Sequence, residues 1–224
     1  MIVLIITAVR VKSMDSHRIS GRILAENIAG PGMMRLVEQS MQARAQKTSV
    51  TEIAVKEWKH PQAALTFDDG PDIRYTPLLL DGLKERNVRA SFFLLGEKVE
   101  QYPELVERMQ KEGHLVGNHT YHHVQLNKLN ETKAREEILK TNNLIYETTG
   151  VYPLYLRPPF GAWKKNLELC VEMLPVFWTI DTLDWKVQNT EKIVRTVQEQ
   201  IEDGAIILMH DEYDTSVEAA LQVA

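Results

Sequence analysis

The feature that most constrains the fold is an alternation of two kinds of segment from residue 63 onward. Short runs rich in β-branched and aromatic residues predict strands. They occupy residues 63–67, 90–95, 115–117, 154–156, 176–180 and 205–209. Between several of them lie stretches whose apolar residues recur at helical spacing, at 76–86, 97–112 and 132–149. Six such units without an internal repeat predict an α/β protein whose parallel strands are covered by helices.

The polar residues of these units gather at one end of the predicted strands. A sheet of this kind can close into a barrel or stay open with helices on both faces, and in both cases ligands sit beyond the carboxyl ends of the strands. Reactive side chains follow five of the six predicted strands, in segments 68–71, 118–123, 157–161, 181–185 and 208–211. This arrangement predicts a single functional site at that edge.

Two histidines in the second of these segments point to a metal ion. His119 and His123 are four residues apart, so on one helical turn both imidazoles face the same side. A carboxylate then completes a three-ligand site with an open position, as in catalytic metal centres. Two histidines and one carboxylate suit Zn²⁺, although other divalent metals fit as well.

Composition excludes several other classes of protein. Hydrophobic residues make up 44% of the 224 residues and charged residues 25%, which is typical of a soluble globular domain. With 26 Lys and Arg against 31 Asp and Glu, the net charge of −5 argues against nucleic acid as a partner. The single cysteine, Cys170, cannot form an internal disulfide and is interpreted as a small core residue.

The first 57 residues are predicted to be a lead-in, and residues 58–224 a catalytic domain. The apolar run at 2–9 is less than half as long as the ~20 residues that cross a bilayer. It is interpreted as the remnant of a longer membrane anchor, as a short strand, or as residues that are not native. Weakly helical stretches and a polar linker follow it.

Taken in order, these five polar segments resemble those of the polysaccharide deacetylase family, whose catalytic domain is called NodB-like or carbohydrate esterase family four. The resemblance covers about residue 61 to the end of the chain and implies a distorted (β/α) barrel of about seven strands. The chain stops 14 residues after His210, where family members continue, so the resemblance implies a barrel that is incomplete at its C-terminus. Phe160 and Thr182 stand where Tyr and Ser are common.

The resemblance also implies roles for individual residues. Asp69, His119 and His123 match the metal ligands, Asp68 matches the general base, and His210 matches the general acid. Arg157 is expected to hold Asp68, and Asp184 to orient His210 and raise its pKa. The substrate-binding residues implied are Phe160, through its backbone N–H and its ring, and Trp185 and Leu208, which form a pocket for the acetyl methyl group. The remaining histidines are assigned no role: His122 is expected to face away from the metal, and His114 to make structural contacts.

The implied activity is metal-dependent hydrolysis that removes N-acetyl groups from the N-acetylglucosamine residues of a polysaccharide. Peptidoglycan is the favoured polymer, which implies a bacterial cell-envelope or extracellular enzyme, anchored to the membrane if the native N-terminus is longer. Chitin oligomers, poly-N-acetylglucosamine and O-acetylated xylan stay open as substrates, as does a truncated domain that binds glycan without turnover. The oligomeric state is left open.

Overall fold

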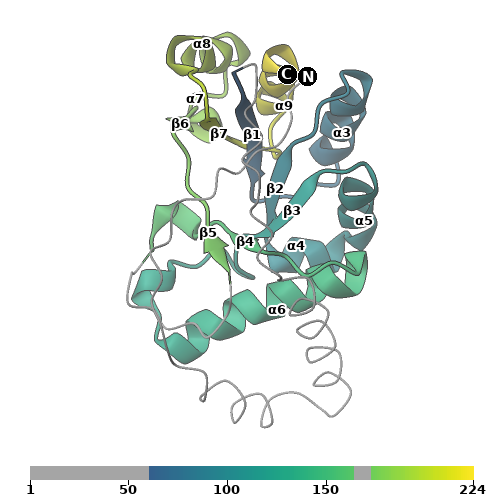
Figure 1. The fold of residues 1–224 in the computed structure, drawn as a ribbon, viewed down its shortest axis with the longest axis vertical. Coiled ribbons are helices and arrows are strands. Elements are labelled where there is room, and N and C mark those ends of the chain that lie inside the picture. The colour runs from purple at the N-terminus through teal and green to yellow at the C-terminus, as the bar shows by residue number, and fades with distance from the viewer. Residues whose placement is uncertain (1–60, 164–172) are drawn as a thin grey trace, which may run out of the picture. The chain divides into compact units, whose positions relative to one another are not determined.

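A parallel β-sheet that curls into a half-barrel forms the centre of this computed structural model, which describes residues 61–163 and 173–224 (Figure 1). The described strands lie in the order β5-β4-β3-β2-β1-β7-β6, and every neighbouring pair is parallel. The prediction of an α/β barrel of about seven strands is therefore confirmed. The strands are β1 (Ala63–Asp68), β2 (Ser91–Leu94), β3 (Leu115–Asn118), β4 (Tyr155–Leu156), β5 (Leu174–Pro175), β6 (Ile180–Asp181) and β7 (Ala205–His210).

Helices connect most of these strands. The described helices are α3 (Tyr75–Glu85), α4 (Gly96–Gln101), α5 (Pro103–Lys111), α6 (Glu131–Thr149), α7 (Asp184–Val187), α8 (Thr190–Gln200) and α9 (Asp214–Val223). Two 3₁₀ turns, Leu126–Lys128 and Pro159–Gly161, lie before α6 and after β4. In the part of the chain that is described, no helix is long and apolar enough to cross a membrane.

Two elements differ from the sequence-based prediction. The helix predicted at 97–112 is divided into α4 and α5 at Tyr102, whose backbone leaves the helical region (φ −133°, ψ 56°). The residue before a proline is disfavoured in the helical conformation, and Pro103 follows it. The strand predicted at 176–180 is largely wrong, because residues 176–179 lie between two short strands: β5 ends at Pro175 and β6 begins at Ile180. The predicted lead-in at 1–57 and Cys170 lie outside the described residues.

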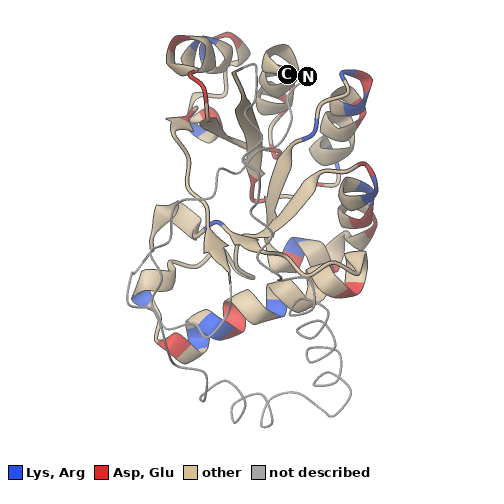
Figure 2. Cartoon of the chain, in the orientation of Figure 1, with Lys and Arg blue, Asp and Glu red and all other residues tan. Residues whose placement is uncertain are grey.

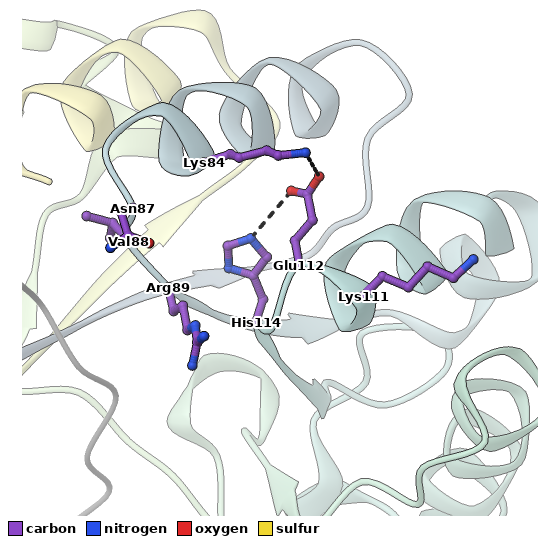
Figure 3. Close-up of a pocket in the computed structure, with 7 residues that line it drawn as sticks. All are labelled: Lys84, Asn87, Val88, Arg89, Lys111, Glu112 and His114. Carbon is purple, nitrogen blue, oxygen red and sulfur yellow. Dashed lines mark hydrogen bonds and ion pairs between the residues drawn. The ribbon is translucent and has the colours of Figure 1, made fainter.

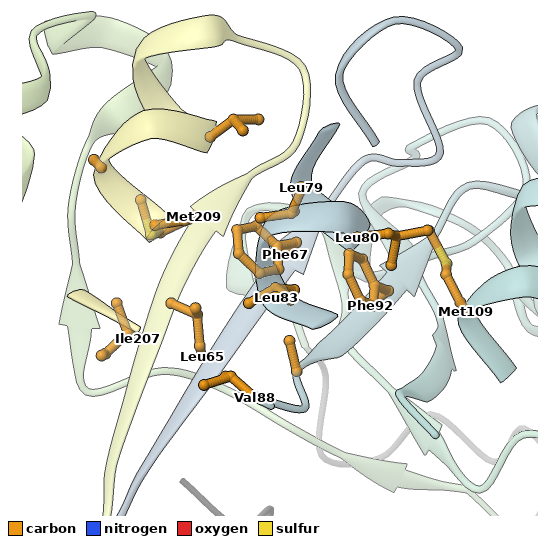
Figure 4. Close-up of a cluster of buried hydrophobic side chains, with 14 of the residues drawn as sticks. Leu65, Phe67, Leu79, Leu80, Leu83, Val88, Phe92, Met109, Ile207 and Met209 are labelled. Atoms are coloured by element: carbon orange, nitrogen blue, oxygen red, sulfur yellow. The ribbon is translucent and has the colours of Figure 1, made fainter. Parts of the chain in front are cut away.

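The main hydrophobic core lies between the central strands and the helices α3, α5 and α9 (Figure 4). Phe67 of β1 and Phe92 of β2 are fully buried, and their rings stack with centroids 5.3 Å apart. Leu79, Leu80 and Leu83 of α3 cover this pair. A second cluster, formed by Leu126, Ala134, Ile138 and Leu156, fixes α6 against β4.

The charged residues lie mainly on the helices and in the loops, and the strands carry few of them (Figure 2). The exceptions are at the strand ends. Asp68 is 3% exposed at the end of β1, and Arg157, directly after β4, is fully buried. A charge inside a protein is costly unless it is paired, so these two residues direct attention to that edge of the sheet.

Candidate active site

Three side chains at the carboxyl ends of β1 and β3 form a group that could hold a metal ion. Asp69 follows β1, and its Oδ1 lies 3.3 Å from Nε2 of His119 and 3.3 Å from Nε2 of His123. This carboxylate oxygen is buried and accepts no hydrogen bond. A buried acceptor that faces two imidazole nitrogens fits a divalent cation, because such an ion would satisfy all three atoms.

The two histidines meet through a bent loop rather than the predicted helical turn. Thr120 and His123 have left-handed backbones, with φ of 69° and 54°. The side chain of Asn118 accepts a hydrogen bond from the N–H of Thr120 at 2.7 Å, and the hydroxyl of Thr120 accepts one from the N–H of Val124 at 3.3 Å. Spacing by four residues therefore brings the rings together, with centroids 5.1 Å apart, by a different backbone path.

Hydrogen bonding and charge prepare these side chains for a metal. Nδ1 of His119 donates to the carbonyl oxygen of Arg157 at 2.6 Å, and this bond orients the ring so that Nε2 faces Asp69. Burial alone would raise the pKa of Asp69, but the neighbouring imidazoles of His119, His123 and His210 hold it well below its usual value. Burial lowers the pKa of His123. Carboxylate and neutral imidazole are the forms that bind metal.

Asp68, the neighbour of Asp69, is paired with the buried guanidinium of Arg157. Nη1 of Arg157 donates to its Oδ1 at 2.7 Å and to the hydroxyl of Thr66 at 2.8 Å. The rest of the guanidinium is fixed by the carbonyl oxygens of Val176 and Phe177, both at 3.4 Å, and lies over the ring of Phe93. Oδ2 of Asp68 lies 3.7 Å from Nε2 of His119, so this second oxygen faces the candidate metal group.

His210 faces the same group from the end of β7. Its Nε2 lies 3.9 Å from Oδ2 of Asp69, and its Nδ1 donates to Asp184 at 2.8 Å. Asp184 is fully buried and also accepts from the backbone N–H of His210 and the hydroxyl of Ser216, each at 2.7 Å. Burial would lower the pKa of His210, but the bond to Asp184 and the charges of Asp184, Asp69 and Asp68 raise it to about 9. The imidazole is therefore protonated at neutral pH.

The three residues expected to contact substrate differ in exposure. Phe160 is 63% exposed, has a left-handed backbone (φ 60°) and places its ring 4.6 Å from that of His123. Trp185 is 49% exposed at the start of α7. Leu208 is 5% exposed, and its carbonyl oxygen accepts the hydroxyl proton of Thr182 at 2.8 Å.

Sequence reasoning missed several supporting residues. Ser216 binds Asp184, Thr66 shares Arg157 with Asp68, and Glu137 of α6 binds the loop between the two histidines. Asp211 is fully buried beside Gly70 and accepts a hydrogen bond from Thr76. Only Asp211, next to His210, lies in one of the five polar segments identified from the sequence. The others lie outside these segments and are 15 or more residues away from the loop or side chain that they contact.

A separate hollow of about 250 Å³ lies at the opposite, amino end of β2 and β3 (Figure 3). Val88 and His114 are the buried residues of its lining. Nδ1 of His114 accepts the N–H of Ala90 at 3.1 Å, and its ring packs edge-on against Phe92. Burial lowers the pKa of His114 to about 4. The predicted site residues are absent from its lining, which consists of Lys84, Asn87, Val88, Arg89, Lys111, Glu112 and His114.

The fold and the site place this protein among α/β barrels that carry a candidate metal centre at the carboxyl ends of their strands. The centre consists of a carboxylate and two histidines, and a buried Asp–Arg pair and an Asp–His pair flank it. The family model described as polysaccharide deacetylase matches residues 56–176, which is more than half of the chain. The chain therefore belongs to the polysaccharide deacetylase family.

Individual relatives agree with this family. A peptidoglycan-N-acetylglucosamine deacetylase of Bacillus cereus is 44% identical over 66% of this chain and 55% of its own length. The peptidoglycan-N-acetylmuramic acid deacetylase PdaC of Bacillus subtilis is 42% identical over 71% of this chain and 34% of its own length. The match thus spans about half of the first relative and a third of the second. The solved structure of PdaC superimposes with a TM-score of 0.72 at 41% identity, covering 74% of this chain and 82% of that structure.

Proposed function

We propose that this chain is a metal-dependent hydrolase that removes the N-acetyl group from N-acetylglucosamine residues of peptidoglycan. The observation that carries this proposal is the different placement of two neighbouring carboxylates. A buried oxygen of Asp69 faces His119 and His123, whereas Asp68 is bound through one oxygen by Arg157 and keeps its second oxygen unpaired with Arg157. The names of the relatives support an acetylated wall polymer as substrate. They also favour a cell-envelope location, at the wall.

The proposed ligands of the metal are Asp69, His119 and His123, and the proposed ion is Zn²⁺. When bound, such an ion supplies Lewis-acid polarisation of the acetamide carbonyl and makes water more acidic. Asp69, His119 and His123 would offer such an ion one carboxylate oxygen and two imidazole nitrogens, a donor set that suits catalytic zinc.

The protein's own residues then carry the protons. Asp68 accepts a proton from the attacking water at Oδ2, because Oδ1 is occupied by Arg157. The oxygen that becomes negative is stabilised by the backbone N–H of Phe160. His210 donates a proton from Nε2 to the leaving nitrogen, since its Nδ1 is bound to Asp184. Water and acetamide are thereby converted to acetate and a free amine on the sugar.

The aromatic side chains define the proposed substrate contacts. Phe160, whose ring lies 4.6 Å from that of His123, and Trp185, which follows Asp184, are exposed and offer faces on which sugar rings can pack. Leu208 contributes to the proposed pocket for the acetyl methyl group. Burial of one methyl is worth on the order of 1 kcal/mol.

The test is acetate release by the purified protein from N-acetylglucosamine oligomers and from intact peptidoglycan, with Zn²⁺, after chelation, and after Zn²⁺ is restored. We expect release that the chelator stops and the metal restores. Analysis of the product separates glucosamine from deacetylated muramic acid, the sugar on which the PdaC relative acts. A folded, metal-loaded protein that releases no acetate from either substrate would contradict the proposal and favour a glycan-binding domain.

Two variants test the separate roles proposed for Asp68, as general base, and His119, as metal ligand. Asp68→Asn should lower kcat by about 10²- to 10⁴-fold, because the general base is lost, while metal content stays at the wild-type level. His119→Ala should lose the metal first, as measured by metal analysis after dialysis. If Asp68→Asn lost the metal and His119→Ala kept it, the two roles would be assigned wrongly.

A further inference from the structure

A carboxylate on α6 contacts the loop between the two proposed metal-binding histidines. Oε2 of Glu137 accepts the backbone N–H of Tyr121 at 3.0 Å and that of His122 at 2.9 Å. Oε1 lies 2.7 Å from Nδ1 of His122, and the Glu137 side chain is only 15% exposed. One side chain therefore holds two consecutive residues of the five that run from His119 to His123.

This loop needs support from outside. Its ends at Thr120 and His123 have left-handed backbones, which non-glycine residues rarely adopt without being held there. The N–H groups of Thr120 and Val124 are bound from within the segment, by Asn118 and Thr120 respectively. The N–H groups of Tyr121 and His122, in the middle of the loop, are bound by Glu137 instead.

Other contacts fix the helix that carries Glu137. The amide of Asn118 at the end of β3 donates to the carbonyl oxygen of Ile138 at 2.9 Å and to the side chain of Asn142 at 2.6 Å. Ile138 is itself fully buried in the second core cluster. Tyr121 is held by a hydrogen bond to Glu100 and by Lys140 over its ring. The helix therefore keeps its place when the Glu137 carboxylate is removed, and the change is confined to the loop.

We propose that Glu137 is a positioning residue that sets the distance between His119 and His123 and thereby the metal affinity of the site. This inference rests on the proposed metal centre. Side chains in the second layer around a metal site typically change its affinity by roughly 10- to 100-fold when they are replaced.

The test measures metal binding rather than turnover. The variants are Glu137→Gln, Glu137→Ala and a matched control, Glu136→Gln, which removes the same charge from the exposed neighbouring position on α6. Zn²⁺ affinity is measured by competition with a chromophoric chelator, and the Co²⁺-loaded proteins are compared by visible absorption. We expect Kd for Zn²⁺ to rise roughly 10- to 100-fold in Glu137→Ala, less in Glu137→Gln, and not in Glu136→Gln. The Co²⁺ spectrum should change in the two Glu137 variants only.

A further variant distinguishes the contacts of Glu137 with the loop backbone from its contact with the side chain of His122. His122→Ala removes the contact with Oε1 but leaves both backbone N–H bonds to Oε2, so its Kd should stay within about twofold of wild type. If His122→Ala lost as much Zn²⁺ affinity as Glu137→Ala, the contact between Glu137 and the His122 side chain would account for the effect, and the proposal would be overturned.

An unchanged Kd and Co²⁺ spectrum in folded Glu137 variants would overturn it as well. If Glu137→Ala does not fold, Glu137→Gln, which keeps the size and one acceptor oxygen, decides the matter. Because no substrate is used, a wild-type protein that binds metal but releases no acetate would contradict the proposed function and leave this inference standing.

Discussion

At the scale of single residues, the candidate site shows how neighbouring groups acquire opposite properties. Asp69 is ionised because protonatable imidazoles surround it, and His210 is protonated because carboxylates surround it. In both cases burial acts in the opposite direction, so the specific partners determine the outcome. An ionised carboxylate and a protonated imidazole can therefore coexist at neutral pH with their atoms 3.9 Å apart.

The pairing of Asp184 with His210 predicts a change in pH dependence. In Asp184→Asn the charge that keeps the proton on His210 is gone, and burial then lowers the His210 pKa from about 9. We expect the alkaline limb of the profile of kcat/KM against pH to move to lower pH, and kcat/KM at neutral pH to fall by roughly 10-fold or more.

The control is Asp181→Asn, which removes a carboxylate three residues earlier whose side chain accepts the N–H of Leu183. Its alkaline limb should stay in place. If the alkaline limb of Asp184→Asn stayed at the wild-type pH, His210 would not be the general acid.

At the scale of elements, the carboxyl ends of the strands could be predicted because their polar segments interrupt runs of apolar residues. Asp68, His119, Arg157 and His210 were placed at one edge by this argument alone, and the helix predicted at 132–149 corresponds to α6. The division of the helix at Tyr102 depends on a local effect of Pro103 that the apolar pattern does not reveal. Glu137 could not be found because it contacts two backbone N–H groups, which leave no trace in a sequence, and the side chain of His122, which is 15 residues away.

The end of α6 offers a test of how such a boundary is set. Gly150 closes the helix with a left-handed backbone (φ 71°), and a Cβ built there meets nothing within 4 Å. In Gly150→Ala the cost is therefore conformational, and the free energy of unfolding should fall by about 1 kcal/mol or slightly more. Gly150→Asn should cost less, because Asn tolerates this conformation.

Urea denaturation measures both changes. Glu147→Ala, at an exposed position in the same helix, should stay within about 0.5 kcal/mol of wild type. Equal losses for Ala and Asn at position 150 would mean that the backbone conformation does not determine the cost.

At the scale of the whole molecule, two buried groups, His114 and Asp211, and the partly buried His210 have large pKa shifts that couple stability to pH. His114 lies at the amino ends of the strands, whereas His210 and Asp211 lie at the carboxyl end of β7. Burial lowers the pKa of His114 to about 4 and raises that of Asp211 to about 7, while carboxylates raise that of His210 to about 9. Their ordinary values are 6.5, 3.8 and 6.5, and each difference defines a pH range in which folding takes up or releases a proton.

The signs of these three contributions differ. Between pH 4 and 6.5 the unfolded chain protonates His114 and the folded protein does not, so stability rises with pH. Over nearly the same range the folded protein keeps the proton on Asp211 and the unfolded chain loses it, so stability falls with pH. The two slopes oppose each other at about 1.4 kcal/mol per pH unit each. Above pH 6.5 the folded protein retains the His210 proton, and stability falls until about pH 9.

For the metal-free protein the slopes of His114 and Asp211 therefore oppose each other between about pH 4 and 6.5, and the lowered pKa of His123 adds a slope that rises with pH below 6.5. Above pH 6.5 the raised pKa of His210 makes the free energy of unfolding decline. Single substitutions should reveal the two opposing contributions to the pH dependence of stability, because each substitution removes one of them. His114→Gln, whose amide oxygen can still accept the N–H of Ala90, should leave stability falling with pH from about 4 upward. Asp211→Asn, which can still accept the hydroxyl proton of Thr76, should leave it rising over the same range. Urea unfolding at half-unit steps of pH, with chelator present, measures both profiles. Parallel profiles in the two variants would show that proton uptake at opposite ends of the strands does not set the pH dependence of this fold.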